Sequence, residues 1–231
     1  NAGNTILMLA VQKNTNIEVI QHLCTIFNDT IDINKQNTHG DTVLILAAQH
    51  NIDVEVLKYL YNTFKDRIDI NNELLLAAEK ANVALLKSLH AIFKDKININ
   101  TIIMKMIQKN TNIEVLKIIC KTFKNTITIS SKDTNGNTAL MLAVKYNINE
   151  KVTQYLCTTF KNTIKINIQN DDGYTALMLA VKYNTNNKII QYLCDTFKNT
   201  IKINTQDQNG YTALMLAIRK SRVKYICITF K

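Results

Sequence analysis

Five cysteines and four histidines are the residues of this 231-residue sequence with the clearest capacity for chemistry. They are Cys24, Cys120, Cys157, Cys194 and Cys227, with His22, His39, His50 and His90. Thiolates and imidazoles hold a zinc ion when three or four of them converge, and two cysteines form a disulfide in an oxidising compartment. Whether these groups can converge depends on the elements that carry them.

The cysteines are part of a repeat that runs through the whole sequence. Each cysteine lies three residues before a phenylalanine, and the seven phenylalanines are Phe27, Phe64, Phe93, Phe123, Phe160, Phe197 and Phe230. All five glycines open the frame Gly-x-Thr-x-Leu-x-Leu-Ala, at Gly3, Gly40, Gly136, Gly173 and Gly210. The full-length repeats have 37 residues. One phenylalanine per repeat predicts seven repeats in a single array over 1–231, approximately 1–34, 35–71, 72–100, 101–130, 131–167, 168–204 and 205–231.

Each repeat has the pattern of two helices joined by a polar break. In the sixth repeat, Thr175 is a residue type that caps helix N-termini, and residues 176–183 are apolar on most faces, which indicates a short buried helix. Apolar residues then recur at steps of three and four, which indicates a second, amphipathic helix; they are Ile189, Ile190, Leu193, Cys194 and Phe197. One such pair cannot bury its apolar side alone, whereas stacked pairs can. The sequence therefore predicts an all-α repeat solenoid.

Stacking of this kind argues against a metal site or a disulfide. Equivalent positions on stacked helices are about 8–10 Å apart, whereas a disulfide needs Cα atoms within about 7 Å of each other. The same position is Tyr61 and His90 in two repeats, so it does not require sulfur. We predict buried, reduced core cysteines, which suit a reducing compartment. Because every glycine belongs to the repeat turn, none remains for a phosphate-binding loop, and we expect no metal, no cofactor and no catalytic residue.

Residues 172–180, Asp-Gly-Tyr-Thr-Ala-Leu-Met-Leu-Ala, resemble the signature of the ankyrin repeat family, and Ile203-Asn204 resembles the pair that closes an ankyrin repeat. The Pro and His of that signature are replaced here by Ala176 and Met178. The resemblance implies an ankyrin-type helical solenoid with a short β-hairpin finger before each helix pair, and it implies protein binding. The abundance of Asn, Ile and Lys also resembles ankyrin arrays of giant DNA viruses of the mimivirus type, and arrays of intracellular bacteria and some protists are similar.

The third and fourth repeats lack the residues that would form a finger. The closing Asn34 is 13 residues before the helical Ala47, whereas Asn71 is only 6 residues before Ala77. The same shortening recurs after Asn100. Loss of these residues is neutral in an array that tolerates loop deletion, or it creates a notch that bends the array or receives part of a partner.

The ends of the sequence bear on its origin and location. The first residues have no basic region before an apolar run, so we predict no signal peptide. No apolar stretch reaches the roughly 18 residues of a transmembrane helix. Because the sequence begins within the repeat pattern and ends without a polar capping repeat, we expect it to be part of a longer chain. We expect an intracellular location in a cytoplasm, including that of a host cell.

Positive charge is concentrated in the second half of the sequence. Residues 1–116 carry 11 basic and 12 acidic side chains, whereas residues 117–231 carry 17 basic and 6 acidic ones. The resemblance to ankyrin arrays implies binding through the finger tips and the exposed ends of the first helices. In the later repeats these positions are Asn137, Lys145, Tyr146, Tyr174, Lys182, Tyr183, Tyr211, Arg219 and Lys220.

These residues predict a non-catalytic scaffold whose partner is another protein with an acidic surface. Tyr and Arg are common at protein interfaces but Lys is depleted there, so an ordinary solvated surface is equally consistent with the pattern. The basic half also permits binding of a nucleic acid or another polyanion, although no nucleic-acid recognition motif is present. A structural array, or a regulatory segment beside a catalytic domain, is the third alternative. We expect no membrane partner.

Overall fold

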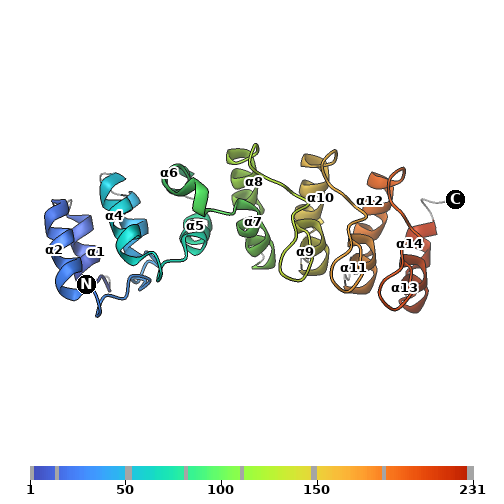
Figure 1. Ribbon diagram of the computed structural model, residues 1–231. Helices are drawn as coiled ribbons and strands as arrows, with labels where there is room; N and C mark the ends of the chain where they lie inside the picture. The colour runs from blue at the N-terminus through green and yellow to red at the C-terminus, as the bar shows by residue number, and fades with distance from the viewer. Residues whose placement is uncertain are drawn as a thin grey trace. The chain divides into compact units, whose positions relative to one another are not determined.

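The computed structural model describes residues 3–13, 16–49, 54–80, 83–109, 112–146, 150–183 and 186–227 (Figure 1). They belong to a first compact unit, Asn1–Asn98, and a second, Ile99–Lys231. The first unit contains α1 (Ile6–Gln12), α2 (Ile17–Phe27), α3 (Val43–Gln49), α4 (Val54–Phe64), α5 (Ile70–Glu79), α6 (Val83–Phe93) and the 3-10 turn η1 (Lys94–Lys96). The second contains α7 (Ile99–Gln108), α8 (Ile113–Thr122), α9 (Ala139–Tyr146), α10 (Glu150–Thr159), α11 (Ala176–Tyr183), α12 (Asn187–Phe197), α13 (Ala213–Arg219) and α14 (Val223–Cys227).

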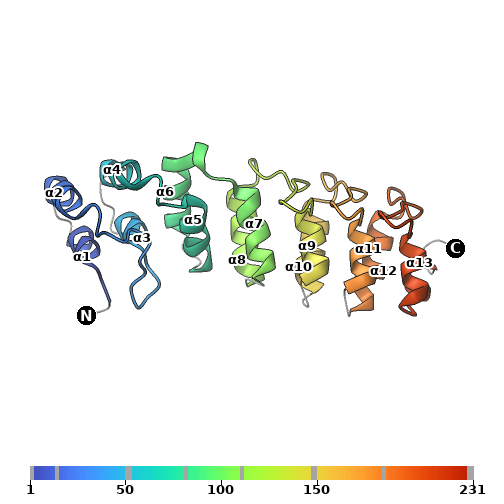
Figure 2. The ribbon, with the colours of Figure 1, turned by 60° about the horizontal axis from the view of Figure 1, so that its bottom comes forward.

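Within each unit the helices stack in pairs, as the repeat predicts (Figures 1 and 2). The odd-numbered helices form an inner row, in which α11 packs between α9 and α13, and the even-numbered helices form an outer row, in which α12 packs between α10 and α14. No β-strand occurs among the residues that the structure describes. The predicted all-α repeat solenoid is therefore confirmed.

The inner helix α11 is buried on most sides because it packs against α9 and α13 in its own row and against α12 in the outer row. In α11, Leu177, Met178 and Leu179 are each 1% exposed, and Ala180 is completely buried. The outer helix α12 buries the five predicted apolar residues, Ile189, Ile190, Leu193, Cys194 and Phe197. The predicted Phe230 lies outside the described residues.

The fingers are tight turns that precede α3, α9, α11 and α13. In the finger of α11, the N–H of Asn170 donates to the carbonyl of Tyr174 (3.0 Å) and the Asn170 side chain accepts from the N–H of Tyr174 (2.8 Å). Gly173 has φ +82°, and a Cβ atom on it would lie 2.6 Å from the backbone nitrogen of Gln208 in the next finger. Both the backbone conformation and the contact therefore require glycine. The β-hairpins expected here are reduced to turns, with one isolated bridge, Gln206 to Thr212, in the described part of the chain.

Repeats 3 and 4 lack fingers, as predicted, and their inner helices start earlier. α5 and α7 have 10 residues each, whereas α9 and α11 have 8. Asp69 caps α5 directly, because its carboxylate accepts from the N–H groups of Asn71 (3.0 Å) and Asn72 (3.3 Å). The residues that would lead into a finger thus become the first turn of the helix.

A second link between neighbouring repeats comes from the asparagine that closes each repeat. The Asn167 side chain accepts from the N–H of Lys202 (2.7 Å) and donates to the carbonyl of Thr200 (2.7 Å) in the next repeat. Closing asparagines of other repeats make the same bonds. The Asn34 side chain donates to the carbonyl of Arg67 (2.7 Å), and the Asn71 side chain accepts from the N–H of Asn98 (2.8 Å). The backbone groups that these asparagines bind lie four or two residues before the asparagine that closes the next repeat. The link therefore fixes the register of each loop against the loop of the next repeat.

Methionine takes part in capping the inner helices. The Thr175 hydroxyl accepts from the N–H of Met178 (3.3 Å), and the Met178 sulfur accepts from the N–H of Thr175 (3.4 Å). The same reciprocal pair joins Thr5 with Met8 and Thr138 with Met141. The sulfur therefore satisfies a buried N–H that the helix leaves free, in addition to the packing role predicted from sequence.

We expect Met178→Leu to lower the free energy of unfolding by about 1 kcal/mol, because leucine fills the space but leaves the Thr175 N–H without an acceptor. Met104→Leu is the matched control, since Met104 occupies the same repeat position in α7, where the equivalent threonine, Thr101, lies inside the helix and not at its N-cap. Urea unfolding and the exchange rate of the Thr175 amide hydrogen measure the effect. Equal losses in the two variants would show that the sulfur acts through packing alone.

Candidate functional site

The residues predicted to bind a partner lie on the second unit at the C-terminal ends of the inner helices and in the fingers. Tyr146 and Tyr183 are 48% and 45% exposed at the ends of α9 and α11. Lys145 and Lys182 precede them and are half-buried. At the end of α13, Arg219 and Lys220 are both exposed, and Tyr211 in the preceding finger is 37% exposed.

Lysine and tyrosine side chains join α9 to α11 in one continuous row. The Lys145 ammonium lies 5.0 Å from the ring centre of Tyr146 and 5.5 Å from that of Tyr183. The Lys182 ammonium lies 5.0 Å from the ring centre of Tyr183 and 4.2 Å from that of Tyr174. Cations at these distances are attracted to the faces of aromatic rings. The row therefore presents rings and charges in fixed relation to each other.

The end of the second unit repeats this arrangement with arginine. The Arg219 guanidinium lies 5.2 Å from the ring centre of Tyr211. Among the residues that the structure describes, no ion pair engages Lys145, Lys182, Arg219 or Lys220. Their charges are consequently available to a partner.

Tyr174 and Asn137 are not exposed finger tips, contrary to the prediction. Tyr174 is 8% and Asn137 4% exposed, because each is covered by the finger that follows. Asn170 of one finger donates to the Asn137 side-chain oxygen of the preceding finger (2.9 Å). Tyr211 is exposed because no described finger follows it.

Tyr174 acts instead on its lysine neighbour. The Lys182 ammonium donates to the Tyr174 hydroxyl at 2.6 Å, and this hydrogen bond raises the pKa of Lys182. The ring and hydroxyl of Tyr174 therefore hold Lys182 in its charged form beside the exposed ring of Tyr183.

A second concentration of positive charge, which was not predicted from the sequence, lies in the loops that follow the outer helices. The α10 loop (160–167) and the α12 loop (197–204) both read Phe-Lys-Asn-Thr-Ile-Lys-Ile-Asn, whereas the α2 loop (27–34) reads Phe-Asn-Asp-Thr-Ile-Asp-Ile-Asn. The exposed lysines of these loops are Lys161, Lys165, Lys198 and Lys202. Aligning the repeats by charge as well as by apolar residues would have found them.

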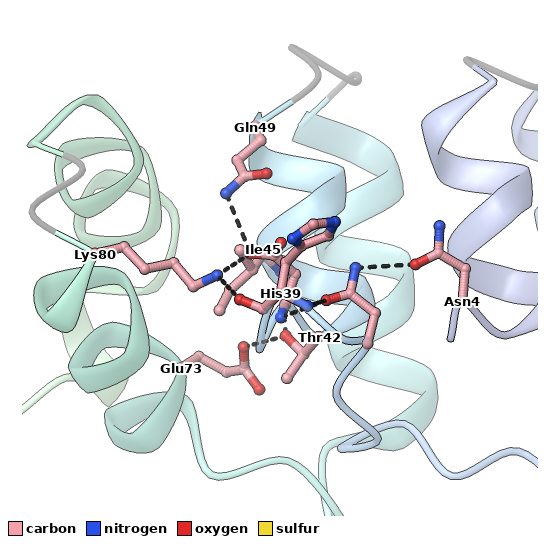
Figure 3. A network of polar contacts seen from close by, with 9 residues as sticks. Asn4, His39, Thr42, Ile45, Gln49, Glu73 and Lys80 are labelled. Atoms are coloured by element: carbon pink, nitrogen blue, oxygen red, sulfur yellow. Dashed lines mark hydrogen bonds and ion pairs between the residues drawn. The ribbon is translucent and has the colours of Figure 1, made fainter. Parts of the chain in front are cut away.

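A polar cluster in the first unit was also missed (Figure 3). In the finger of α3, the Asn37 side chain donates to the side chain of Asn4 (2.9 Å), which lies just before α1. No finger follows on α5, and there the Lys80 ammonium donates to the Asp41 carboxylate (2.7 Å) and to the carbonyl of His39 (2.5 Å). In other repeats the next finger contacts these positions. Lys80 takes its place here and contacts the finger of α3.

Glu73 is the most deeply buried ionisable side chain of this cluster. It is 1% exposed, and the Thr42 hydroxyl donates to its carboxyl oxygen at 2.5 Å. Burial raises the pKa of Glu73 to about 7. A carboxyl group with such a pKa resembles a catalytic acid, but its burial excludes substrate, so we assign it to the structure. No sequence signal predicted it, because the other repeats place alanine, valine or isoleucine at this position.

Four of the five cysteines lie in the core as predicted. Cys24, Cys120, Cys157 and Cys194 are buried, and Cys227 is half-buried. Burial raises the pKa of Cys24 to about 11 and the pKa of Cys120, Cys157 and Cys194 to about 12, which opposes formation of the thiolate that metal binding and redox chemistry need. Within the described ranges, no cluster of three potential metal ligands occurs. Nor does any described helix have the length and apolarity to cross a membrane.

Comparison with known proteins agrees with this architecture. A family model described as ankyrin repeats (3 copies) matches residues 1–73, 74–170 and 158–229. Among solved structures, the fold is similar to that in the crystal structure of the ankyrin repeat domain of Bcl-3, a unique member of the IkappaB protein family, with a TM-score of 0.59, 18% sequence identity and 100% of both chains covered. No curated protein has a matching sequence. Because the family model matches nearly every residue, this chain belongs to the ankyrin repeat family.

Proposed function

We propose that the chain is a non-catalytic scaffold that binds a partner protein through the inner surface of its second unit, defined by Lys145, Tyr146, Lys182, Tyr183, Tyr211, Arg219 and Lys220. Ankyrin repeat domains generally mediate interactions between proteins, which supports the class of function. The observation that carries the choice of surface is the row of exposed tyrosines held beside unpaired cations. Tyrosine offers a large, rigid contact area, and both Tyr and Arg are frequent at interface hot spots.

The chemistry of this surface favours a partner with carboxylates next to apolar groups. The tyrosine rings provide apolar area, and the four cations lack acidic partners among the described residues. A partner carboxylate beside such a cation gains a charge-assisted hydrogen bond. Tyr174 contributes by positioning Lys182 rather than by touching the partner.

We propose a reducing cytoplasm as the setting of this interaction. Buried thiols with raised pKa suit a reducing cytoplasm. If the array belongs to a giant virus, as its Asn, Ile and Lys content suggests, the partner is a protein of the host cell.

The test is affinity capture with the whole chain, with and without nuclease, beside the variant Lys145→Glu/Lys182→Glu/Arg219→Glu. We expect the same proteins to be captured after nuclease treatment and lost with the variant. The control Lys121→Glu/Lys151→Glu/Lys188→Glu reverses three exposed charges on the outer helices of the second unit and should keep the partners. Capture that collapses with nuclease would indicate nucleic acid, and capture that survives in the first variant would exclude this surface.

A further inference from the structure

A depression of about 750 Å³ lies in the second unit between the α10 loop and the α12 loop. Its lining contains three exposed lysines, Lys161, Lys165 and Lys198, and one carboxylate, Asp195. Within the described part of the chain, no ion pair engages these lysines. The depression therefore has a net positive charge that nothing described neutralises.

The walls of the depression are fixed by hydrogen bonds. Asn167 joins the two loops through its bonds to Thr200 and Lys202. Each loop is itself closed, because the N–H and the hydroxyl of Thr200 both donate to the carbonyl of Phe197 (2.9 and 3.2 Å), and Thr163 does the same with Phe160 (2.9 and 3.1 Å). Because these loops are already ordered, a ligand that binds between them causes little loss of conformational entropy.

The first unit has an equivalent depression, which an arginine partly occupies. The depression between the α2 loop and the α4 loop is smaller, about 370 Å³, and is lined by Asn28, Asp29, Thr63, Phe64, Asp66 and Arg67. The equivalent six positions, Lys161, Asn162, Thr196, Phe197, Asn199 and Thr200, all line the larger depression. In the second unit, Thr200 therefore stands in place of Arg67. Asn162 and Asn199 stand in place of Asp29 and Asp66.

Arg67 shows which groups an occupant can satisfy. Its guanidinium donates to the carbonyl of Asn28 (3.1 Å), to the Asn28 side chain (3.0 Å) and to the carbonyl of Ile31 (3.1 Å). The corresponding residues in the second unit are Lys161 and Ile164, both of which line the open depression. The site therefore combines carbonyl acceptors with ammonium donors.

We propose that this depression binds an acidic peptide segment of a partner protein. The segment's carboxylates pair with Lys161, Lys165 and Lys198, and its N–H groups take the place that Arg67 fills in the first unit. A polypeptide supplies both N–H donors and carboxylates, whereas a nucleic-acid backbone supplies acceptors that satisfy only the lysines. The site lies on the loops of the outer row and goes beyond the inner surface proposed above.

The variant Thr200→Arg tests the proposal because charge and occupancy predict opposite results. Adding a cation strengthens a purely electrostatic attraction to an acidic peptide, whereas an arginine that bonds across the depression, as Arg67 does in the first unit, takes the place of the peptide. The probe is a short fluorescein-labelled peptide of alternating Glu and Gly, measured by fluorescence anisotropy with the whole chain. We expect Thr200→Arg to weaken binding about tenfold or more.

Thr163→Arg is the matched control, since it adds the same charge one repeat earlier at a residue outside the depression. It should bind the peptide at least as well as the original chain, and circular dichroism should show both variants folded. Tighter or unchanged binding by Thr200→Arg, or no binding of the peptide to the original chain, would overturn the proposal.

A second pair of variants separates this site from general charge. Lys161→Gln/Lys165→Gln/Lys198→Gln should lose the peptide, whereas Lys109→Gln/Lys151→Gln/Lys188→Gln, with the same change in net charge, should retain it. A labelled single-stranded oligonucleotide that binds more tightly than the peptide and is lost with the first triple variant would contradict the peptide and favour nucleic acid. Charge reversal of the inner surface should leave peptide binding unchanged, so the two proposed surfaces fail independently.

Discussion

Replacing Glu73 by glutamine will stabilise the first unit at pH 8 by about 3 kcal/mol and will leave its stability almost unchanged near pH 4. Burial raises the pKa of Glu73 from 4.5 to about 7 in the folded chain. Ionisation is therefore harder in the folded state than in the unfolded state. Glutamine keeps the shape and a hydrogen bond to Thr42 but has no proton to lose.

The direction of the pH dependence follows from this shift. Because the folded pKa is higher, the stability that protonated Glu73 contributes is fully present below about pH 4.5. It is lost as the pH rises towards about 7, and it does not change further above that. The charge of Asp69 raises the pKa of Glu73 further, and Lys80, which pairs with Asp41, belongs to the same polar cluster (Figure 3).

Urea unfolding of the full chain across this pH range, together with amide hydrogen exchange in α3 and α5, measures the effect of Glu73→Gln. The control is Glu79→Gln, which makes the same change at the exposed end of the same helix and should alter stability only slightly at any pH. If the two variants have the same pH profile, Glu73 is ionised in the folded chain at little cost and its assignment is wrong.

Asn170→Ala will destabilise the second unit by about 3 kcal/mol, because two buried groups lose their partners. The Asn170 side chain donates to the Asn137 oxygen and accepts from the N–H of Tyr174, and Asn137 and Tyr174 are both buried. The loss should be greatest in the fingers of α9 and α11. Urea unfolding gives the magnitude, and hydrogen exchange of the Tyr174 amide gives the location.

Asn170→Asp separates the two contributions. Aspartate still accepts from the Tyr174 N–H, as Asp133 and Asp207 accept from the equivalent N–H in their own fingers. Rotation of the Asn137 amide can supply a donor to the new carboxylate, at the cost of its long hydrogen bond to Asp133 (3.4 Å). We expect a loss of less than half that of alanine. An aspartate variant as unstable as the alanine variant would show that the link between fingers, rather than the turn, dominates.

The sequence predicted the helical repeat because each repeat copies the same buried pattern. Gly173 required a positive φ, and the apolar spacing of α12 placed its buried face correctly. Residue counts showed which repeats lack the finger segment that the resemblance to ankyrin repeats implies. These features depend on local conformation and on burial that recurs in every repeat.

The features that the sequence did not predict depend on contacts between repeats that differ from the pattern. Tyr174 follows a turn glycine like Tyr211, but only Tyr174 is covered by a following finger. Lys80 contacts the Asp41 finger only because the next finger is absent. Glu73 becomes a buried acid because α5 begins early and points this position at Thr42. Each depends on the neighbour across the stack.

Photo-cross-linking from the inner surface tests the central claim most directly. A benzoylphenylalanine at Tyr183, which is exposed at the end of α11, should form adducts with one or a few proteins in a cell extract, and Lys145→Glu/Arg219→Glu should abolish them. The same probe at Lys188, exposed on α12, should give none of these adducts. Equal adducts from both positions, or adducts with nucleic acid alone from Tyr183, would contradict a protein-binding inner surface.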